Sequence, residues 1–164
     1  MLPALSPIAK SLILISAANM APVGLKLLLS KRFSAPIDGG LVCRDGRRFL
    51  GRSKTWRGLA IGVLFPACLS PLIGLSWLAG ASAGAAAMAG DCLSSFIKRR
   101  MGLQSSGMAL GLDQIPEALL PAISMQTYVR LSVIDICIIV LVFSVGALAL
   151  SRIFFRLGLR ERPY

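Results

Sequence analysis

The sequence predicts an all-α, polytopic membrane protein in which residues 1–164 form a single integral-membrane domain with about five transmembrane helices. Hydrophobic residues make up 55% of the chain and charged residues only 15%, and the mean hydropathy is +0.75. A soluble domain is roughly a quarter charged, so much of this surface must face lipid. Long uncharged runs and clusters of cations between them are the other two observations behind this prediction.

The first predicted helix covers residues 8–29, where an apolar stretch interrupted mainly by Lys26 is long enough to cross a bilayer. Because this stretch is longer than the apolar core of a signal peptide, we expect it to be retained. The next uncharged run, residues 58–90, would be about 50 Å long as one helix, too long for a hydrocarbon core of about 30 Å. Prolines and glycines interrupt it, so we predict two helices, at 57–75 and 78–98.

Two further helices are predicted at 112–129 and 131–150. The second is an apolar run, whereas the first contains Asp113, Glu117 and two prolines. The cations decide whether the first of these crosses the membrane, because positively charged loops stay in the cytoplasm. Most of the 18 lysines and arginines fall into three groups, which are Lys31, Arg32, Arg44, Arg47, Arg48, Arg52, Lys54 and Arg57; Lys98, Arg99 and Arg100; and Arg152, Arg156, Arg160 and Arg162.

All three groups lie in the cytoplasm only if residues 112–129 also cross the membrane. The predicted topology therefore has the N-terminus out and the C-terminus in, with cytoplasmic loops at 30–56 and 99–111. The net charge of +11 is then a topology signal and a contact for anionic lipids, and it does not indicate a nucleic-acid-binding protein. The first loop also mixes its cations with Asp38, Asp45, glycines and Thr55, as a folded loop that holds a ligand would.

The chain has no histidine, which excludes a His-based catalytic triad, a histidine general base and a histidine metal site. Its four cysteines lie far apart and form no C-x-x-C pair, so we expect them to act as small hydrophobic side chains. Any catalysis therefore depends on carboxylates, cations, metal ions and the charge of the substrate itself.

Ionisable residues at membrane depth are costly, and by default they mark a site. Asp91, Ser95 and Lys98 fall on one face of the third predicted helix. Asp113 and Glu117 share a face at the start of the fourth, so both groups of acids flank the second cytoplasmic loop. Carboxylates without histidine suit Mg²⁺, which favours oxygen ligands and usually also takes substrate phosphates.

The same residues also allow a purely structural explanation. Asp91 could form a salt bridge with Lys98 or Arg57, and Asp135 is expected to be structural, for instance paired with Arg130.

Two other features are open to more than one explanation. Asn19, in the middle of the first predicted helix, is either an interhelical hydrogen-bonding residue or part of the site. A strip of small residues at Gly80, Gly84 and Ala87 would let another helix pack closely, and such strips would also allow a homodimer.

A series of short polar motifs follows the predicted helices in a fixed order. One motif begins at Gly90-Asp91 and continues to Lys98-Arg99-Arg100, and it is followed by residues 111–114. The first loop contributes residues 36–39, 44–51 and 54–58. Over about residues 19–121 this pattern resembles the CTP-dependent lipid cytidylyltransferases, and more narrowly the CDP-archaeol synthase family, small five-helix relatives of the CDP-diacylglycerol synthases.

The resemblance implies that Asp91 and Asp113 bind a divalent metal, Mg²⁺, and that these two acids and Lys98 carry the catalysis. The family tends to have a second acid where this chain has Pro116, so Glu117 is the third candidate metal ligand. The residues that we expect to bind substrate are Lys54, Thr55, Trp56, Arg57, Ser95, Arg99, Arg100, Asn19 and Asp45.

The implied reaction transfers CMP from CTP to a lipid phosphate, archaetidic-acid-like or phosphatidic-acid-like, and gives a CDP-lipid and pyrophosphate. The partners are then CTP, a membrane lipid phosphate and the bilayer, with the active site on the cytoplasmic side of the cell membrane. One alternative is a CDP-alcohol phosphotransferase, whose D-G-x-x-A-R motif is missing from this sequence. Another is a non-catalytic small transporter or scaffold subunit, which would leave the long polar loop without a role.

Overall fold

The computed structural model describes residues 5–30, 32–103 and 111–156. The regular elements within these ranges are helices, which loops connect. The helices are α1 (Pro7–Leu29), α2 (Trp56–Leu69), a short 3-10 helix η1 (Ser70–Ile73), α3 (Trp77–Arg100), α4 (Gln114–Met125) and α5 (Val133–Arg156). In the described part of the chain no strand forms, and two isolated bridges brace the loop between α1 and α2. Lys31, Arg160, Arg162 and residues 104–110 of the predicted second loop lie outside the described residues.

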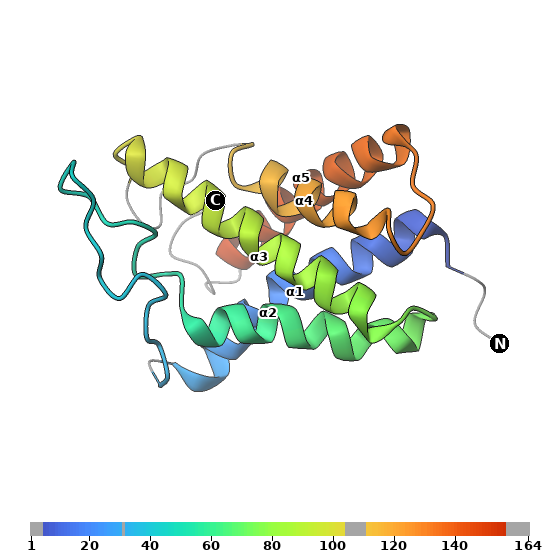
Figure 1. The fold of residues 1–164 in the computed structure, drawn as a ribbon, viewed down its shortest axis with the longest axis horizontal. Coiled ribbons are helices and arrows are strands. Elements are labelled where there is room, and N and C mark those ends of the chain that lie inside the picture. The colour runs from blue at the N-terminus through green and yellow to red at the C-terminus, as the bar shows by residue number, and fades with distance from the viewer. Residues whose placement is uncertain (1–4, 31, 104–110, 157–164) are drawn as a thin grey trace.

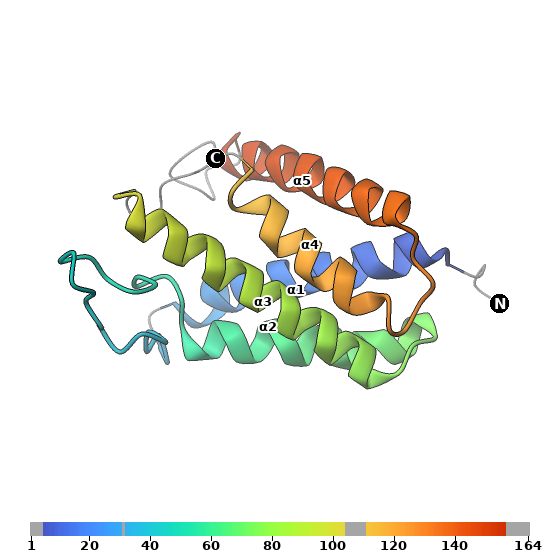
Figure 2. The ribbon, with the colours of Figure 1, turned by 45° about the horizontal axis from the view of Figure 1, so that its top comes forward.

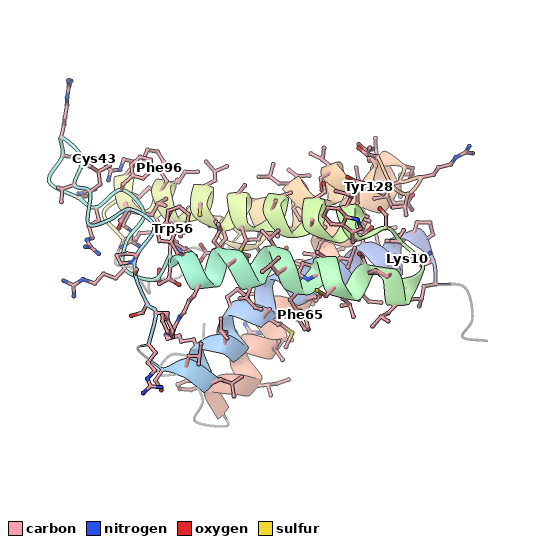
Figure 3. The ribbon with its side chains drawn as sticks, turned by 60° about the horizontal axis from the view of Figure 1, so that its bottom comes forward. Lys10, Cys43, Trp56, Phe65, Phe96 and Tyr128 are labelled. Atoms are coloured by element: carbon pink, nitrogen blue, oxygen red, sulfur yellow. The ribbon has the colours of Figure 1, made fainter. Side chains whose placement is uncertain are left out.

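Successive helices alternate in direction along the long axis of the bundle (Figures 1 and 2). The loop between α1 and α2 lies at one end, together with the C-terminal end of α3. The connection between α4 and α5 and the start of α1 lie at the other end. In Figure 3, Cys43, Trp56 and Phe96 mark the first end, and Lys10 and Tyr128 mark the second. The first two predicted groups of cations therefore share one end of the bundle.

Side-chain caps fix the starts of three helices. The side chains of Ser6, Thr55 and Ser76 accept hydrogen bonds from backbone N–H groups in the first turns of α1, α2 and α3. Gly74, in the left-handed conformation with φ of 73°, ends η1 and separates α2 from α3 within the long uncharged run. The bounds of α1 and α3 differ by at most two residues from those expected at 8–29 and 78–98. α2 ends at Leu69, six residues before the end expected for 57–75, and η1 continues that segment to Ile73.

The last two helices differ more from expectation. α4 is shorter than the predicted 112–129, because residues 111–113 form a turn before it and residues 126–128 form turns after Met125. A helix of this length rises only about 18 Å, so the turns complete its path along the bundle. α5 runs on from the predicted end at residue 150 to Arg156, since no glycine or proline interrupts that stretch.

Glycines let α3 pack closely against two neighbours. A Cβ atom at Gly84 would lie 2.5 Å from the carbonyl oxygen of Gly62 in α2, and one at Gly90 would lie 2.6 Å from the carbonyl carbon of Pro116 in α4. Both distances are shorter than a van der Waals contact, so only glycine fits there. The small-residue strip of α3 is therefore occupied within the chain, and a homodimer would need another surface.

The outer surface of the bundle is apolar. Three helical segments are long and hydrophobic enough to cross a membrane, namely Pro7–Leu29, Trp56–Ile73 and Val133–Ile153. Large side chains such as Leu28, Leu72 and Val133 are more than 70% exposed, which a lipid environment explains. α3 is less hydrophobic because it packs against α1, α2 and α4, and its inward face consists largely of alanine, glycine and serine. The chain is therefore an all-α membrane protein.

Candidate functional site

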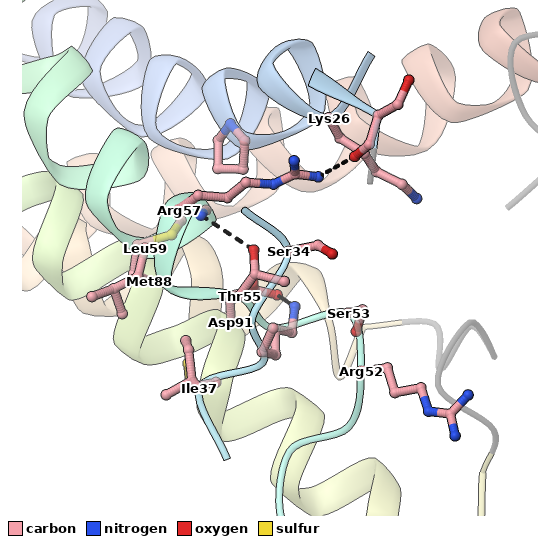
Figure 4. A pocket seen from close by; sticks show the side chains of 15 residues that line it. Lys26, Ser34, Ile37, Arg52, Ser53, Thr55, Arg57, Leu59, Met88 and Asp91 are labelled. Atoms are coloured by element: carbon pink, nitrogen blue, oxygen red, sulfur yellow. Dashed lines mark hydrogen bonds and ion pairs between the residues drawn. The ribbon is translucent and has the colours of Figure 1, made fainter. Parts of the chain in front are cut away.

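A pocket with a volume of about 240 Å³ lies at the loop end of the bundle (Figure 4). Its walls come from the end of α1, the loop, the start of α2 and the middle of α3. The charged residues among its lining are Lys26, Arg52, Lys54, Arg57 and Asp91. Among the described residues, four cations and one acid thus surround a cavity of small-molecule size, which favours an anionic ligand.

Lys54 and Asp91 form an ion pair across this pocket, between the loop and α3. The loop backbone holds Lys54 in place, because the N–H of Ile37 donates to its carbonyl oxygen at 2.8 Å. Both side chains are less than one-third exposed. The sequence had suggested Lys98 or Arg57 as partners of Asp91 in a structural salt bridge; the partner in the structure is Lys54.

Lys98 instead pairs with Asp113, with 2.7 Å between Nζ and Oδ1. Lys98 lies in the last turns of α3, and Asp113 immediately precedes α4. The pair therefore joins the end of α3 to the start of α4, the two helices that the predicted second loop connects. Both side chains are at most 20% exposed, so the pair is shielded from much of the solvent.

Glu117 links the two pairs. Its carboxyl group shares a hydrogen bond with Asp91, and the charges of Lys54 and Asp113 both act on it. This contact depends on the close approach of α3 and α4, where the backbone at Pro116 lies against Gly90. The three acids expected from the sequence to bind metal are thus gathered in one row, with the two lysines beside them.

The acids do not form a ready-made metal cage. In the described ranges, no group of three or more histidine, cysteine or acidic side chains is close enough to enclose an ion. Asp91 and Glu117 nevertheless bring two carboxyl groups close together, and a divalent cation could bind between them. Mg²⁺ commonly uses one or two protein carboxylates together with substrate phosphates, so the oxygen donors of Asp91 and Glu117 fit it.

The run from Thr55 to Arg57 has structural roles at the start of α2. Thr55 caps the helix, and the Trp56 side chain is 57% exposed and lies outside the pocket lining. Arg57 lines the pocket but donates hydrogen bonds to the carbonyl oxygen of Ser30, at 2.7 Å, and to that of Arg32. Arg57 therefore fastens the end of α1 to the loop.

A second part of the loop is clamped to the end of α3. Arg100 Nη1 pairs with Asp45 Oδ1 at 2.7 Å, and Arg100 Nη2 donates to the carbonyl oxygen of Arg48 at 2.8 Å. Arg47 Nη1 donates in return to the carbonyl oxygen of Arg100 at 2.6 Å. Phe49 and Phe96 pack beneath this clamp with ring centroids 5.0 Å apart. Asp45 and Arg100, both expected to bind substrate, thus bind each other.

The remaining expected residues lie away from the pocket lining. Asn19 donates to the carbonyl oxygen of Ile15 at 3.0 Å, one turn earlier in α1. Ser95 is only 4% exposed, and Arg99 is also buried, beside a second cavity.

Asp135 accepts hydrogen bonds from the backbone N–H and the hydroxyl of Ser132, both at 2.8 Å, so it caps α5 at the far end of the bundle.

Asp38 organises the loop, a role that was not predicted from the sequence. Its carboxylate accepts backbone hydrogen bonds from Gly40, Leu50 and Gly51 at 2.9–3.2 Å. Partial burial raises the pKa of Asp38, but these N–H groups and the charge of Arg48 outweigh it, so the pKa lies below its usual value. The Asp-Gly-Gly sequence is a typical turn signal, and it could have indicated this bend.

Comparison with known proteins identifies the family. The model of the CarS-like CDP-archaeol synthases matches residues 69–164, more than half of the chain. The CDP-archaeol synthase of Hyperthermus butylicus is 42% identical over 119 residues, covering 68% of both chains. That of Sulfurisphaera tokodaii is 31% identical over 141 residues, covering 79% of this chain and 81% of the relative. The match to that of Thermococcus kodakarensis, at 42% identity, spans about half of either chain.

A solved structure gives the same result. An intramembrane enzyme for archaeal membrane lipid biosynthesis superposes with a TM-score of 0.70 and 28% identity, covering 85% of this chain and 89% of the other. The resemblance drawn from the motifs is thereby confirmed, and the chain belongs to the CarS-like CDP-archaeol synthase family.

Proposed function

We propose that this chain transfers CMP from CTP to the phosphate of a membrane lipid and releases pyrophosphate. The names of its relatives and the family match support this reaction. The observation that carries it is the row of Lys54, Asp91 and Glu117 beside Lys98 and Asp113, at a pocket lined by cations. Neither the phosphotransferase nor the transporter alternative is favoured by these findings.

The chemistry suits a site without histidine. An oxygen of the lipid phosphate attacks the α-phosphorus of CTP, and the bond from this phosphorus to the β-phosphate oxygen breaks as pyrophosphate leaves. A phosphomonoester has a second pKa near 6 and is already anionic at neutral pH, so no general base is needed. The main obstacle is the repulsion between two phosphate-bearing reactants, which cations placed around them reduce.

The lysines and acids have complementary tasks in this proposal. Without substrate, Lys54 neutralises Asp91 and Lys98 neutralises Asp113. With substrate, each lysine turns to a phosphate oxygen, and Asp91, Glu117 and Asp113 are the residues that would hold Mg²⁺. The ion would supply charge neutralisation and orientation of the phosphates.

The location of the pocket supports a site on the cytoplasmic side. The pocket lies at the same end of the bundle as the loop cations, and such clusters stay in the cytoplasm. CTP is a water-soluble anion and would reach the pocket from this side. The lipid phosphate, archaetidic-acid-like or phosphatidic-acid-like, would approach laterally with its tails between the helices.

Incubation of the purified protein with radiolabelled CTP, Mg²⁺ and a panel of lipid phosphates tests the reaction. We expect labelled CMP in the lipid fraction with at least one lipid phosphate, and no incorporation across the panel would refute the proposal. Omission of Mg²⁺ should abolish the incorporation, which tests the metal separately.

An Asp91→Asn variant tests the site. It should lose CDP-lipid formation while its insertion into the membrane stays intact, because the change removes the charge from the row of acids but keeps the shape. Asp135→Asn is the matched control, since Asp135 caps α5 at the opposite end, and this variant should remain active. Near-normal turnover of Asp91→Asn would contradict the proposed role.

A further inference from the structure

A second cavity, with a volume of about 370 Å³, lies between the loop and the C-terminal end of α3. The ionisable residues among its described lining are four arginines, Arg47, Arg48, Arg52 and Arg99, with no acid beside them. Gly51, Gly102 and Leu103 complete the wall. Four guanidinium groups around one cavity repel one another, so this arrangement favours a multivalent anion between them.

The cavity is built by fixed contacts. The clamp between Arg47 and Arg100 joins its two sides, loop and helix. Gly51 and Gly102 have φ of 98° and 78°, which other residues rarely adopt, and they let the backbone turn at the rim without adding side chains. The cavity therefore has a defined shape at the loop end of the bundle.

Arg48 contributes a buried donor group to this cavity. Its Nη1 atom is buried and makes no hydrogen bond within the described residues, although the charge of Arg48 acts on Asp38. A buried donor without a partner is costly, and an anion in the cavity would satisfy it. Arginine is also the side chain best shaped to hold phosphate oxygens in pairs.

We propose that this cavity is a second phosphate-binding site, separate from the pocket that contains Lys54 and Asp91. Arg52 lines both cavities, so the two sites adjoin. Given the proposed function, on which this part rests, pyrophosphate leaving the first pocket could pass along Arg52 into the second. The same arginines would equally bind the phosphate of an anionic lipid headgroup, and the experiment distinguishes the two sources.

Isothermal titration of the full chain with pyrophosphate tests the proposal. The protein is first saturated with a non-hydrolysable CTP analogue, which fills the first pocket. Wild type should still bind pyrophosphate, and Arg48→Gln should bind it at least about 10-fold more weakly, as expected for the loss of a charged hydrogen bond. Arg44→Gln is the matched control, because Arg44 is exposed in the same loop and lines neither cavity, and it should bind as wild type does.

Arg52→Gln should also weaken pyrophosphate binding. Because Arg52 is exposed, this substitution should leave the contacts of the loop unchanged, which Arg48→Gln does not guarantee. No binding to the analogue-saturated wild type, or wild-type affinity in both Arg48→Gln and Arg52→Gln, would overturn the proposal. The same titration without the analogue measures how Arg48→Gln changes the affinity for pyrophosphate. This arm gives a result even if the chain does not bind CTP. Failure of the second site and failure of the proposed function are thereby distinguished.

Nanodiscs separate the two sources of phosphate. Wild-type protein is titrated with pyrophosphate in neutral discs, in discs with phosphatidic acid and in discs with oleate at equal charge. A lipid headgroup in the site would lower the pyrophosphate affinity only in the phosphatidic acid discs. A site for soluble pyrophosphate would give the same affinity in both kinds of anionic disc.

Discussion

Gly90→Ala is the change that tests the contact between α3 and α4 most directly. The new Cβ would lie 2.6 Å from the carbonyl carbon of Pro116 and 2.9 Å from the backbone nitrogen of Glu117. Carbon atoms in contact are about 3.5–4.0 Å apart, so the two backbones must separate by about 1 Å. Both neighbours are backbone atoms, which cannot rotate away as the end of a side chain could.

The separation acts on the site because Gly90 precedes Asp91 and Pro116 precedes Glu117. Forcing the helices apart pulls the two carboxyl groups out of hydrogen-bonding distance. Overpacking of this kind costs about 1–3 kcal/mol of stability, and a displacement of about 1 Å in an active site can lower the rate about 100-fold. We therefore expect a loss of CDP-lipid formation that is larger than the loss of stability alone would cause.

The assay measures turnover and thermal unfolding of Gly90→Ala beside Gly146→Ala. Gly146 lies within α5, and no described atom lies within 4 Å of the position of an added Cβ. Gly146→Ala is therefore the same substitution in a helix, but without a clash. Gly146→Ala should resemble wild type in both measurements. If Gly90→Ala also kept wild-type turnover and stability, the proposed dependence of the site on this contact would be refuted.

Three further predictions concern the loop and its lysine. Lys54→Met should raise the KM for CTP at least about 10-fold, because a charged phosphate contact is lost, whereas Lys10→Met, at the opposite end, should leave steady-state kinetics unchanged. Arg57→Gln should lower the unfolding temperature. Arg57→Lys should recover only part of the lost unfolding temperature, because one ammonium group cannot reproduce the two hydrogen bonds that the guanidinium group donates at the end of α1. Asp38 has a lowered pKa, so its stabilising effect on the loop is complete at neutral pH and is lost only as the pH falls below the ordinary value near 4. Fluorescence of Trp56, followed in acid and compared with Asp38→Asn at pH 7, measures this effect.

The helices were largely predictable because hydrophobic length and helix-breaking residues act locally. The uncharged run 58–90 had to bend, and the structure bends it at η1 and Gly74. The early end of α4 was less predictable, since residues 126–129 contain no glycine or proline that would end a helix. Its turns are stabilised by contacts that only the folded chain supplies, such as the bond from the Gln126 side chain to the carbonyl oxygen of Leu131.

The structure brings the three acids predicted from the sequence close to one another, but their ion-pair partners were not predicted. Polar residues at membrane depth stand out by their cost, which identified Asp91, Asp113 and Glu117. Which cation meets which acid depends on how the loop folds back, and Lys54 is 37 positions away from Asp91. Asp45 and Arg100 were predicted to bind substrate, and the structure pairs them with each other. Their charges alone did not indicate this pairing.

The two lysine–aspartate pairs also bear on how the protein is made. A helix carrying an unpaired acid enters a bilayer with difficulty, and the loop lysine and the α3 lysine each bring a counter-ion from the same chain. The bundle can therefore insert and assemble before any nucleotide or metal is present. The charge balance of these acids within the bundle thus comes from the chain itself.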